Sequence, residues 1–255
     1  MPARIDRTNE IGKDKHGVLM KIIKYINSEN IQVQFLDNYG AIVNTKYDSF
    51  KIGTVKNPYY PSVYGVGYLG QGEYVAVLNK KMTKPYSYWK AMLGRCYCNA
   101  MTQHTLAYED VIVCEKWHNF QNFAKWFDEN YYSVNAEQMC LDKDILGKHK
   151  NIYSPETCIF VPKKINGLFI FGTSSYTTLP VGVYYDSNRN RYIAQCGSNK
   201  SQKRIGQANN PHEAFLMYKV TKENKIKEMA KKYKSKIPIH VFNALMEYEV
   251  DKYYV

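Results

Sequence analysis

The sequence has no run of about 18 apolar residues, the length that a membrane-spanning helix requires. Cysteine is also scarce: six residues in a chain of 255 do not make a disulfide scaffold, and we interpret them as reduced thiols. The first ten residues, MPARIDRTNE, contain no apolar signal core. These absences argue against a membrane protein and against a secreted disulfide-rich domain, so we expect a cytoplasmic protein.

Acidic residues are the second scarcity, because 23 Asp and Glu stand against 35 Lys and Arg, which gives a net charge of +12. Between Pro180 and Lys236 there are 13 Lys and Arg and only 4 Asp and Glu, so most of the excess lies in the last third. The chain also contains 24 tyrosines. Lysines neutralise phosphates and aromatic rings stack on bases, so this clustered basic composition favours a nucleic-acid partner over a merely basic protein without one.

The first 58 residues contain short β-strand patterns separated by turn residues. The runs GVLMKIIKY, IQVQFLD and AIVNTKY are rich in β-branched and aromatic residues, and INSEN and DNYG between them are typical of turns. This order predicts a small β-barrel, similar in outline to barrels of the Src-homology or Tudor type. The sequence leaves two functions open for it: a module that binds nucleic acid or a host protein, or a structural cap.

Residues 59–83 are rich in Gly, Pro and Tyr and predict a linker. Two helices are predicted next, in YSYWKAMLGRCY and NFQNFAKWFDENY, and their regularly spaced aromatic residues are interpreted as core. The segment MCLDKDILGKHKNIYSPETCIFVPKKIN, residues 139–166, then predicts a hairpin. It reads as a strand with acidic residues, a loop, a second strand and a helix that contains an asparagine.

Residues 179–255 predict a second α and β unit. The runs LPVGVYYD, RYIAQCG and KRIG are three short strands separated by polar turns. The helix that follows begins with Asn210 as its cap, Pro211 in its first turn and Glu213 near the positive end of the helix dipole. Its apolar stripe predicts packing against the three strands, and a last helix is predicted over residues 238–249.

Two of these blocks resemble known families. The motifs YWKAMLGRCY, VIVCEKW, LDKDI, IYSPETCIFVP and a closing IN occur in order over residues 84–170 and resemble the phage HNH endonucleases of the homing type. The run from LPVGVYYD to KENKI is similar to the APETALA-type (ethylene-response) DNA-binding domain. The resemblances imply double-stranded DNA as the partner and the cytoplasm of a bacterial host cell as the location.

The fold expected from pattern and resemblance together is of the α+β class. It comprises a small N-terminal β-barrel (1–58), a central HNH-like ββα-metal domain (84–172), and a C-terminal three-stranded sheet plus helix with a further C-terminal helix (179–255).

The HNH resemblance implies specific chemistry in the hairpin. In that family an acidic residue of the first strand and a residue of the closing helix hold a divalent cation, usually Mg²⁺ or Mn²⁺, and an adjacent His activates water. The resemblance therefore assigns the metal ligands to Asp142 and Asn166. Lys143 stands where the base occurs, and Thr157 replaces an asparagine that ties down the loop.

The other charged residues of the hairpin have more than one interpretation. A lysine acts as a general base only where burial or a cationic neighbour favours its neutral form, so Lys143, beside Asp142 and Asp144, suits phosphate contact or charge stabilisation better. Strand alternation predicts Asp144 on the same face as Asp142, where both carboxylates could hold the cation. His149 is a substitute base or an exposed loop residue. An ion-paired strand in a degenerate nuclease fold is the alternative for the whole set.

One group of residues, Cys96, Cys98, Cys114 and His118, suggests a structural zinc site. Their spacing could supply four ligands, but a C-x-C pair within a helical pattern is unusual for zinc. We therefore interpret the cysteines as core thiols and expect no structural zinc.

The third block is expected to read DNA with its sheet. Arginine suits the guanine edge, glutamine suits adenine, and lysine mostly contacts phosphate. The predicted DNA-binding residues are Tyr185, Arg189, Arg191, Gln195, Lys203 and Arg204. The alternative for some of them is solvation of the sheet alone, and Tyr184 and Tyr192 are expected to pack under the helix.

The leading functional hypothesis is a DNA endonuclease that uses one divalent cation at the hairpin. The alternative is a DNA-binding protein on a catalytically degenerate HNH fold, which acts as a regulator or as a phage factor against host machinery. A third possibility is a protein-binding module that docks a host protein through the N-terminal barrel.

Overall fold

The computed structural model describes residues 5–98, 108, 110–147, 151–169, 179–197 and 202–251. It contains both helix and strand, 33% and 26%, which is consistent with the predicted α+β class. Contacts divide the chain into two compact units, Met1–Ala100 with Glu115–Phe127 and Met101–Cys114 with Asp128–Val255. None of the helices in the described part of the chain is both long and apolar enough to cross a lipid bilayer.

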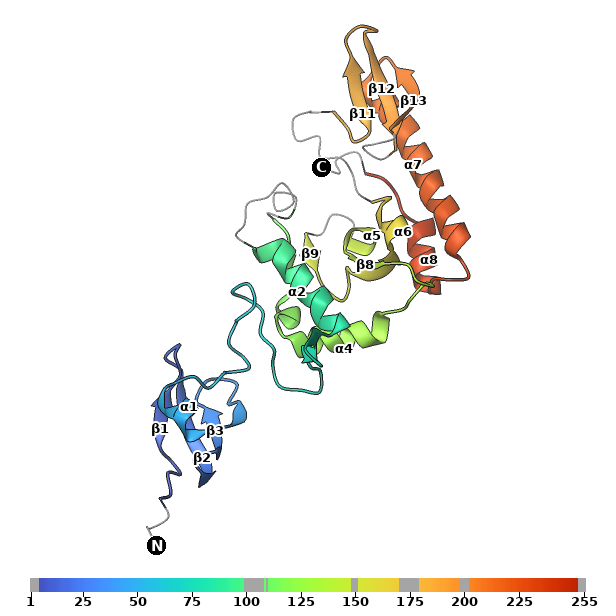
Figure 1. Ribbon diagram of the computed structural model, residues 1–255. Coiled ribbons are helices and arrows are strands. Elements are labelled where there is room, and N and C mark those ends of the chain that lie inside the picture. The colour runs from blue at the N-terminus through green and yellow to red at the C-terminus, as the bar shows by residue number, and fades with distance from the viewer. Residues whose placement is uncertain are drawn as a thin grey trace. The chain divides into compact units, whose positions relative to one another are not determined.

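The N-terminal part of the first unit is an antiparallel sheet followed by a short helix (Figure 1). The strands pair in chain order, and no pairing of the first with the last closes the described sheet, so the predicted barrel is an open four-stranded meander. The chain returns toward the first strand through α1, which contacts β1, and just after this helix the Lys15 N–H donates to the Gly53 carbonyl at 2.8 Å. The elements are β1 (Ile11–Lys13), β2 (Leu19–Asn27), β3 (Asn30–Phe35), β4 (Ile42–Thr45) and α1 (Tyr47–Lys51).

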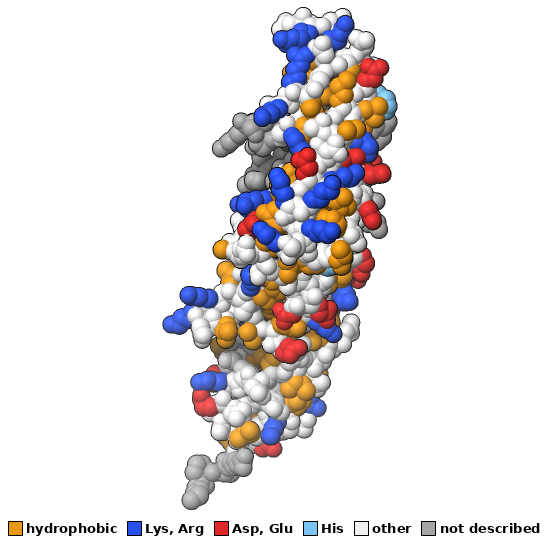
Figure 2. Space-filling model, turned by 90° about the vertical axis from the view of Figure 1, so that its right-hand side faces the viewer, with side chains coloured by type: hydrophobic (Ala, Val, Ile, Leu, Met, Phe, Trp, Pro, Cys, Tyr) orange, Lys and Arg blue, Asp and Glu red, His pale blue; other side chains and the backbone are white. Residues whose placement is uncertain are grey.

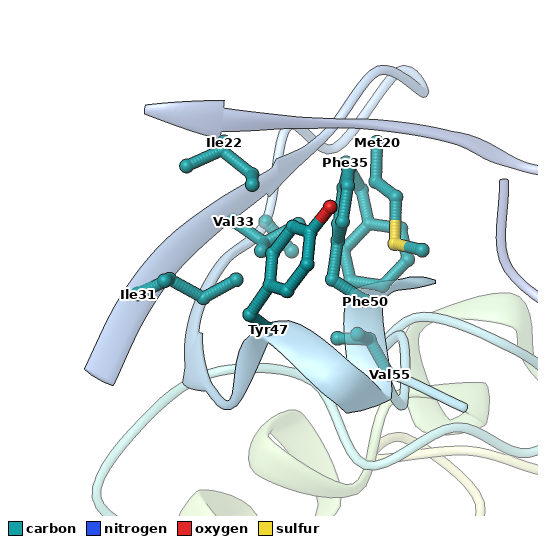
Figure 3. Close-up of a cluster of buried hydrophobic side chains, with 9 residues drawn as sticks. Met20, Ile22, Ile31, Val33, Phe35, Tyr47, Phe50 and Val55 are labelled. Carbon is teal, nitrogen blue, oxygen red and sulfur yellow. The ribbon is translucent and has the colours of Figure 1, made fainter. Parts of the chain in front are cut away.

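The core of this sheet follows from the alternation of its strands. Side chains two residues apart point to the same face, and the apolar ones of β2 and β3 are fully buried on one face. The helix α1 covers that face with Tyr47 and Phe50 (Figure 3). The strand residues of this core are Met20, Ile22, Ile31, Val33 and Phe35.

The rest of the first unit is built on buried aromatic residues, as the sequence predicts. Trp89, Phe120 and Phe123 are fully buried, and the Trp89 indole N–H donates to the Trp117 carbonyl at 2.6 Å. The Trp117 ring packs against that of Trp126, with centroids 4.7 Å apart. The elements here are β5 (Val77–Leu78), β6 (Lys81–Met82), α2 (Lys84–Tyr97), the 3-10 helix η1 (Glu115–His118) and α4 (Phe120–Asn130).

The second unit begins with the hairpin region. Two short pairs of strands form it: β8 is antiparallel to β10, and β7 is parallel to β9. A helix follows each strand of the β8–β10 pair, and both helices are short. The elements are β7 (Ile112–Val113), β8 (Met139–Asp142), α5 (Asp144–Gly147), β9 (Ile152–Tyr153), β10 (Ile159–Pro162) and α6 (Lys163–Asn166).

The C-terminal part of the second unit confirms the predicted three strands and helix. The strands pair in the order β11-β12-β13, and α7 packs against all three. Asn210 caps this helix as expected, because its side-chain oxygen accepts the Glu213 N–H at 2.9 Å. The elements are β11 (Val183–Asp186), β12 (Arg191–Cys196), β13 (Lys203–Ala208), α7 (Pro211–Tyr233) and α8 (Ile239–Met246).

The N-terminal core makes a direct prediction about stability. Replacing Phe35 with Ala removes a fully buried ring between β2 and α1, and the unfolding free energy of this sheet is expected to fall by about 3–5 kcal/mol. The measurement is urea denaturation followed by circular dichroism. Leu36→Ala is the matched control, because this neighbouring side chain is exposed; an equal loss in both variants would contradict the described core.

Candidate functional site

Asp142 is the last residue of β8 and holds the turn that follows it. Its Oδ1 atom accepts the backbone N–H groups of Asp144 at 2.8 Å and Ile145 at 2.9 Å, the first two residues of α5. A carboxylate accepts such amides strongly because they are unpaired at the start of a helix. The strand therefore ends at Asp142. The prediction that strand alternation relates Asp142 to Asp144 is wrong, since Asp144 already belongs to the helix.

The Asp142 carboxyl is buried, with only 6% of the residue exposed. Burial and, after it, the nearby negative charge of Asp144 raise its pKa from 3.8 to about 6, while the two amide hydrogen bonds and the positive charge of Lys143 act in the opposite direction. The two carboxyls are thus close in space even though they do not share a strand. When both are ionised, the carboxyl groups of Asp142 and Asp144 carry two negative charges, and Lys143 beside them supplies one positive charge.

Lys143 is buried as well, at 7% exposure, and its ammonium group donates to Asp144 Oδ1 at 2.5 Å. The ammonium is a hydrogen-bond donor in this ion pair, and it has no lone pair with which to accept a proton. The geometry therefore supports the interpretation of Lys143 as a charge stabiliser and not as a general base. His149, the substitute base considered above, lies outside the described residues.

Thr157 ties down the loop before β10, although it replaces the asparagine expected from the resemblance. Its hydroxyl donates to the Ile152 carbonyl at 2.7 Å and accepts the Ser154 N–H at 3.0 Å. Both Ser154 and Thr157 are buried, so these hydrogen bonds satisfy polar groups that water does not reach. The substitution thus keeps the loop closed by a hydroxyl in place of an amide.

Asn166 ends α6, which packs against both β8 and β10. The helix is joined to the start of the hairpin by the Lys163 N–H, which donates to the Gln138 carbonyl at 2.8 Å. Within the described residues, neither the Asn166 side chain nor Asp142 Oδ2 takes part in a hydrogen bond. The two predicted ligands therefore come from packed elements and keep oxygen atoms without a protein partner.

These oxygen atoms suit a hard divalent cation in their chemistry. Carboxylate and amide oxygens are the ligands that Mg²⁺ prefers, and a cation would compensate the excess negative charge around Asp142. Across the described residues no group of three or more His, Cys, Asp or Glu side chains is arranged to hold a metal ion. A cation at Asp142 would accordingly have Asn166, water or a substrate phosphate as its further ligands.

One cysteine of the hairpin, Cys158, is a buried thiol, whereas Cys140 is only partly buried. Cys158 is buried, and burial raises its pKa to about 12, so it remains protonated at neutral pH and is a poor metal ligand. All six cysteines are free of disulfide bonds. The expectation that Cys96, Cys98 and Cys114 are core thiols stays a prediction.

The register of the C-terminal sheet divides the predicted DNA-binding residues between its two faces. Residues opposite each other in an antiparallel pair share a face, and residues alternate along a strand. The Cys196 thiol accepts a hydrogen bond from Lys225 of α7, so its face is the helix-covered one. Lys203 pairs with Cys196 on that face, and Tyr185 lies there too, paired with Tyr192.

The opposite, outer face carries the other candidates. Gln195 pairs with Arg204, so their side chains share a face. Arg191 precedes Gln195 by four positions on β12, and an even spacing along a strand places its side chain on the same face. Two further residues were not predicted there: Tyr184, which was placed under the helix, and Gln207, both paired with Ile193. The same rule places Ile193, which is fully buried, and Asp186, the partner of Arg191, on this face. Its polar uncharged, basic and aromatic residues are Tyr184, Arg191, Gln195, Arg204 and Gln207.

The turn between β11 and β12 holds the remaining candidate. The Arg189 guanidinium forms an ion pair with Asp186 at 2.6 Å, and this contact lowers the pKa of the Asp186 carboxyl. Tyr185 donates its hydroxyl to Asn190 in the same turn, and its ring lies 5.1 Å from that of Tyr192. The Arg189 guanidinium is thus bound by a carboxylate of the protein, whereas Arg191 and Arg204 of the outer face are bonded to the neutral groups of Asn190 and Gln207 and keep an uncompensated charge.

Comparison of the chain with protein-family models, with curated proteins and with solved structures found no match.

The buried carboxyl makes a prediction about pH. Because the pKa of Asp142 is raised on folding, its stabilising contribution is complete below about pH 4 and is lost as the pH rises through 6. Asp142→Asn keeps the acceptor and removes the charge. We compare the unfolding free energies of Asp142→Asn and the wild type in the presence of EDTA. The variant's value minus the wild-type value should rise by roughly 3 kcal/mol between pH 4 and pH 7.5, because only the wild type must bury a charge at the higher pH.

The measurement is urea denaturation of both proteins across this pH range. The same pH scan on Asp128→Asn, which removes an exposed carboxylate, serves as the control. A pH-independent difference between Asp142→Asn and the wild type would contradict the buried, uncompensated carboxyl.

Proposed function

We propose that this protein binds double-stranded DNA through the outer face of its C-terminal sheet and hydrolyses a phosphodiester bond at the β8–α6 hairpin. The observation that carries the proposal is the Asp142 carboxyl: buried, held by two backbone amides, and with an oxygen that no described residue uses. The hairpin and the sheet also belong to one compact unit, so DNA bound by one lies near the other.

The outer face of the sheet has the chemistry of a major-groove surface. Arg204 is bonded to Gln207, which fixes its guanidinium, and a fixed guanidinium suits the O6 and N7 atoms of guanine. Gln195, beside it, suits adenine, and Arg191 suits guanine or phosphate. Figure 2 shows Lys and Arg side chains over the C-terminal sheet and α7, and their charge would attract the DNA backbone.

The hairpin residues have distinct roles in the proposed hydrolysis. Asp142 and Asn166 would hold a Mg²⁺ or Mn²⁺ ion, which supplies positive charge against the negative charge that develops on the phosphate. The amides of Asp144 and Ile145 keep the Asp142 carboxylate in one orientation. Lys143 and Asp144 form a neutral pair beside it, from which the ammonium can turn to a phosphate oxygen.

A second candidate function is DNA binding without hydrolysis, by a regulator or by a factor that acts against host machinery. The observation in its favour is the Lys143–Asp144 ion pair. The resemblance implies a water-activating base at position 143, and the ammonium group of Lys143 accepts no proton. In that case the hairpin supports the fold, and the open N-terminal sheet is the surface for a host protein.

Cleavage of a plasmid separates the two candidates. Supercoiled plasmid incubated with the protein and Mn²⁺ is expected to become nicked, and Asp142→Asn is expected to reduce the rate about 100-fold or more, since a charged ligand is lost. Asp128→Asn, an exposed carboxylate of α4, should leave the rate unchanged. A gel shift without nicking at any metal concentration would favour the second candidate.

Two arginine substitutions, one on the outer face of the sheet and one in the β11–β12 turn, test which residues contact DNA. Arg204→Gln should weaken binding to a preferred duplex by about 1–3 kcal/mol and relax the preference at one base pair, because a base contact is lost. Arg189→Gln removes the same charge from a guanidinium that Asp186 already holds, so its effect should be smaller. Fluorescence anisotropy measures both, and a larger loss for Arg189→Gln would count against the assigned face.

A further inference from the structure

The β5–β6 hairpin of the first unit lies in the segment predicted as a linker, and its base is fixed by hydrogen bonds. The Thr83 hydroxyl donates to the Val75 carbonyl at 2.8 Å, and the Thr83 N–H donates to the Ala76 carbonyl at 2.9 Å. The Gln121 side chain of α4 accepts the Tyr74 N–H at 3.0 Å and donates to the Tyr74 carbonyl at 2.9 Å. These contacts bind backbone groups, so they hold the hairpin in place without using its apolar side chains.

The apolar side chains of this hairpin point into solvent. Val77, Leu78 and Met82 are each more than half exposed. Among the described strands, β5 and β6 pair only with each other, so no further strand extends this ribbon. Val77 lies opposite Met82 and Leu78 lies opposite Lys81, which places apolar side chains on both faces of the ribbon. A cluster of apolar side chains left outside the core indicates a contact surface.

The turn at the tip holds a lysine in a backbone conformation that favours glycine. Asn79 and Lys80 connect the two strands and have φ of 49° and 62°. Positive φ at both positions is the type I′ turn, whose usual second residue is glycine. A lysine is less stable there, because its Cβ atom crowds the neighbouring carbonyl. The tip therefore keeps a cation where glycine would fit better, which favours an anionic partner.

The charge around the hairpin has one sign. Residues 74–98, which include the hairpin and α2, contain five Lys or Arg and no Asp or Glu. Lys80, Lys81 and Lys84 are all exposed and lie within five positions of one another. Phosphates are the anions that such lysines neutralise in nucleic acids. A DNA groove admits a two-stranded ribbon and contacts both of its faces, whereas a membrane surface contacts only one.

We infer that the β5–β6 hairpin is a second DNA-binding element, which enters a groove of the duplex. Leu78 and Met82 contact the bases, and Lys80 and Lys81 bind phosphates on the two sides. The inference rests on the proposed function for its partner, duplex DNA, and adds a contact from the first unit to that of the C-terminal sheet. Lysine contacts release counterions and apolar contacts do not, so the two contributions differ in their dependence on salt.

The test is fluorescence anisotropy of the full chain with a labelled duplex at several salt concentrations. Lys80→Gln should weaken binding several-fold and reduce the slope of log affinity against log salt by about one, because one phosphate contact is lost. Lys125→Gln is the matched control. It removes an exposed lysine of α4 that precedes the exposed Asp128 by one helical turn, and it should change neither quantity.

The apolar contact has its own variant and control. Leu78→Ser should weaken binding several-fold and leave the salt slope unchanged, because no phosphate contact is lost. Ile52→Ser changes an exposed apolar residue outside the hairpin and should bind as the wild type does. Lys80→Gly guards against misfolding. Because glycine fits the turn, this variant should be at least as resistant to urea as the wild type, yet bind DNA as weakly as Lys80→Gln.

The outcomes separate the hairpin from the proposed function. Wild-type affinity in the Lys80 and Leu78 variants, with a loss in Arg204→Gln, overturns the hairpin contact alone. No binding of the duplex by the wild type overturns the proposed DNA binding together with it. Vesicles that contain phosphatidylserine test the other anionic surface. Sedimentation of the wild type but not of Leu78→Ser with these vesicles, at equal DNA affinity, overturns the inference in favour of a membrane surface.

Discussion

The hydrogen bonds from two backbone amides to the Asp142 carboxylate are the constraint on which the second unit depends. They end β8, start α5, and fix one carboxyl oxygen, while no described residue forms a hydrogen bond with the other. Without them the turn would lose its cap, and only the nearby charge of Lys143 would compensate the buried carboxylate. The pairing of β8 with β10 and the packing of α6 then bring Asn166 to the same hairpin.

The hairpin and the DNA-reading sheet are joined by one long helix. The helix α7 lies under the sheet as far as Lys225, which donates to Cys196, and its last residue is bound to the start of the hairpin region by the Tyr233 hydroxyl, which donates to Glu137 at 2.9 Å. Its flank is bound to the segment after α8, because Lys219 and Glu223 form hydrogen bonds with the backbone of Val250. A single element thus connects the surface proposed to bind DNA with the site proposed to cut it.

The sequence predicts the elements whose signals are local. The three C-terminal strands, the Asn210 cap and the aromatic core of α2 and α4 were all expected, because turn residues, capping residues and periodicity act within a few positions. The prediction that Tyr184 lies under the helix was wrong, whereas Tyr185 is exposed as predicted. The local pattern VYYD does not decide on which face of the sheet each tyrosine lies, because only the pairing with β12 fixes it.

Other features depend on contacts that no local pattern contains. Closure of the N-terminal sheet requires its first and last strands to meet, and they do not within the described residues. The helix α5 is too short for its periodicity to be recognised. Tyr248 lies about eighty positions from Phe169 in the chain, and the packing of the two rings appears only in the folded structure.

The central claim is that a cation binds at Asp142, and Mn²⁺ titration followed by nuclear magnetic resonance tests it most directly. The paramagnetic ion should broaden the amide signals of Asp144 and Ile145 before all others, and Asp142→Asn should abolish this broadening. Broadening that begins elsewhere and leaves these two amides sharp at saturating Mn²⁺ would contradict the account.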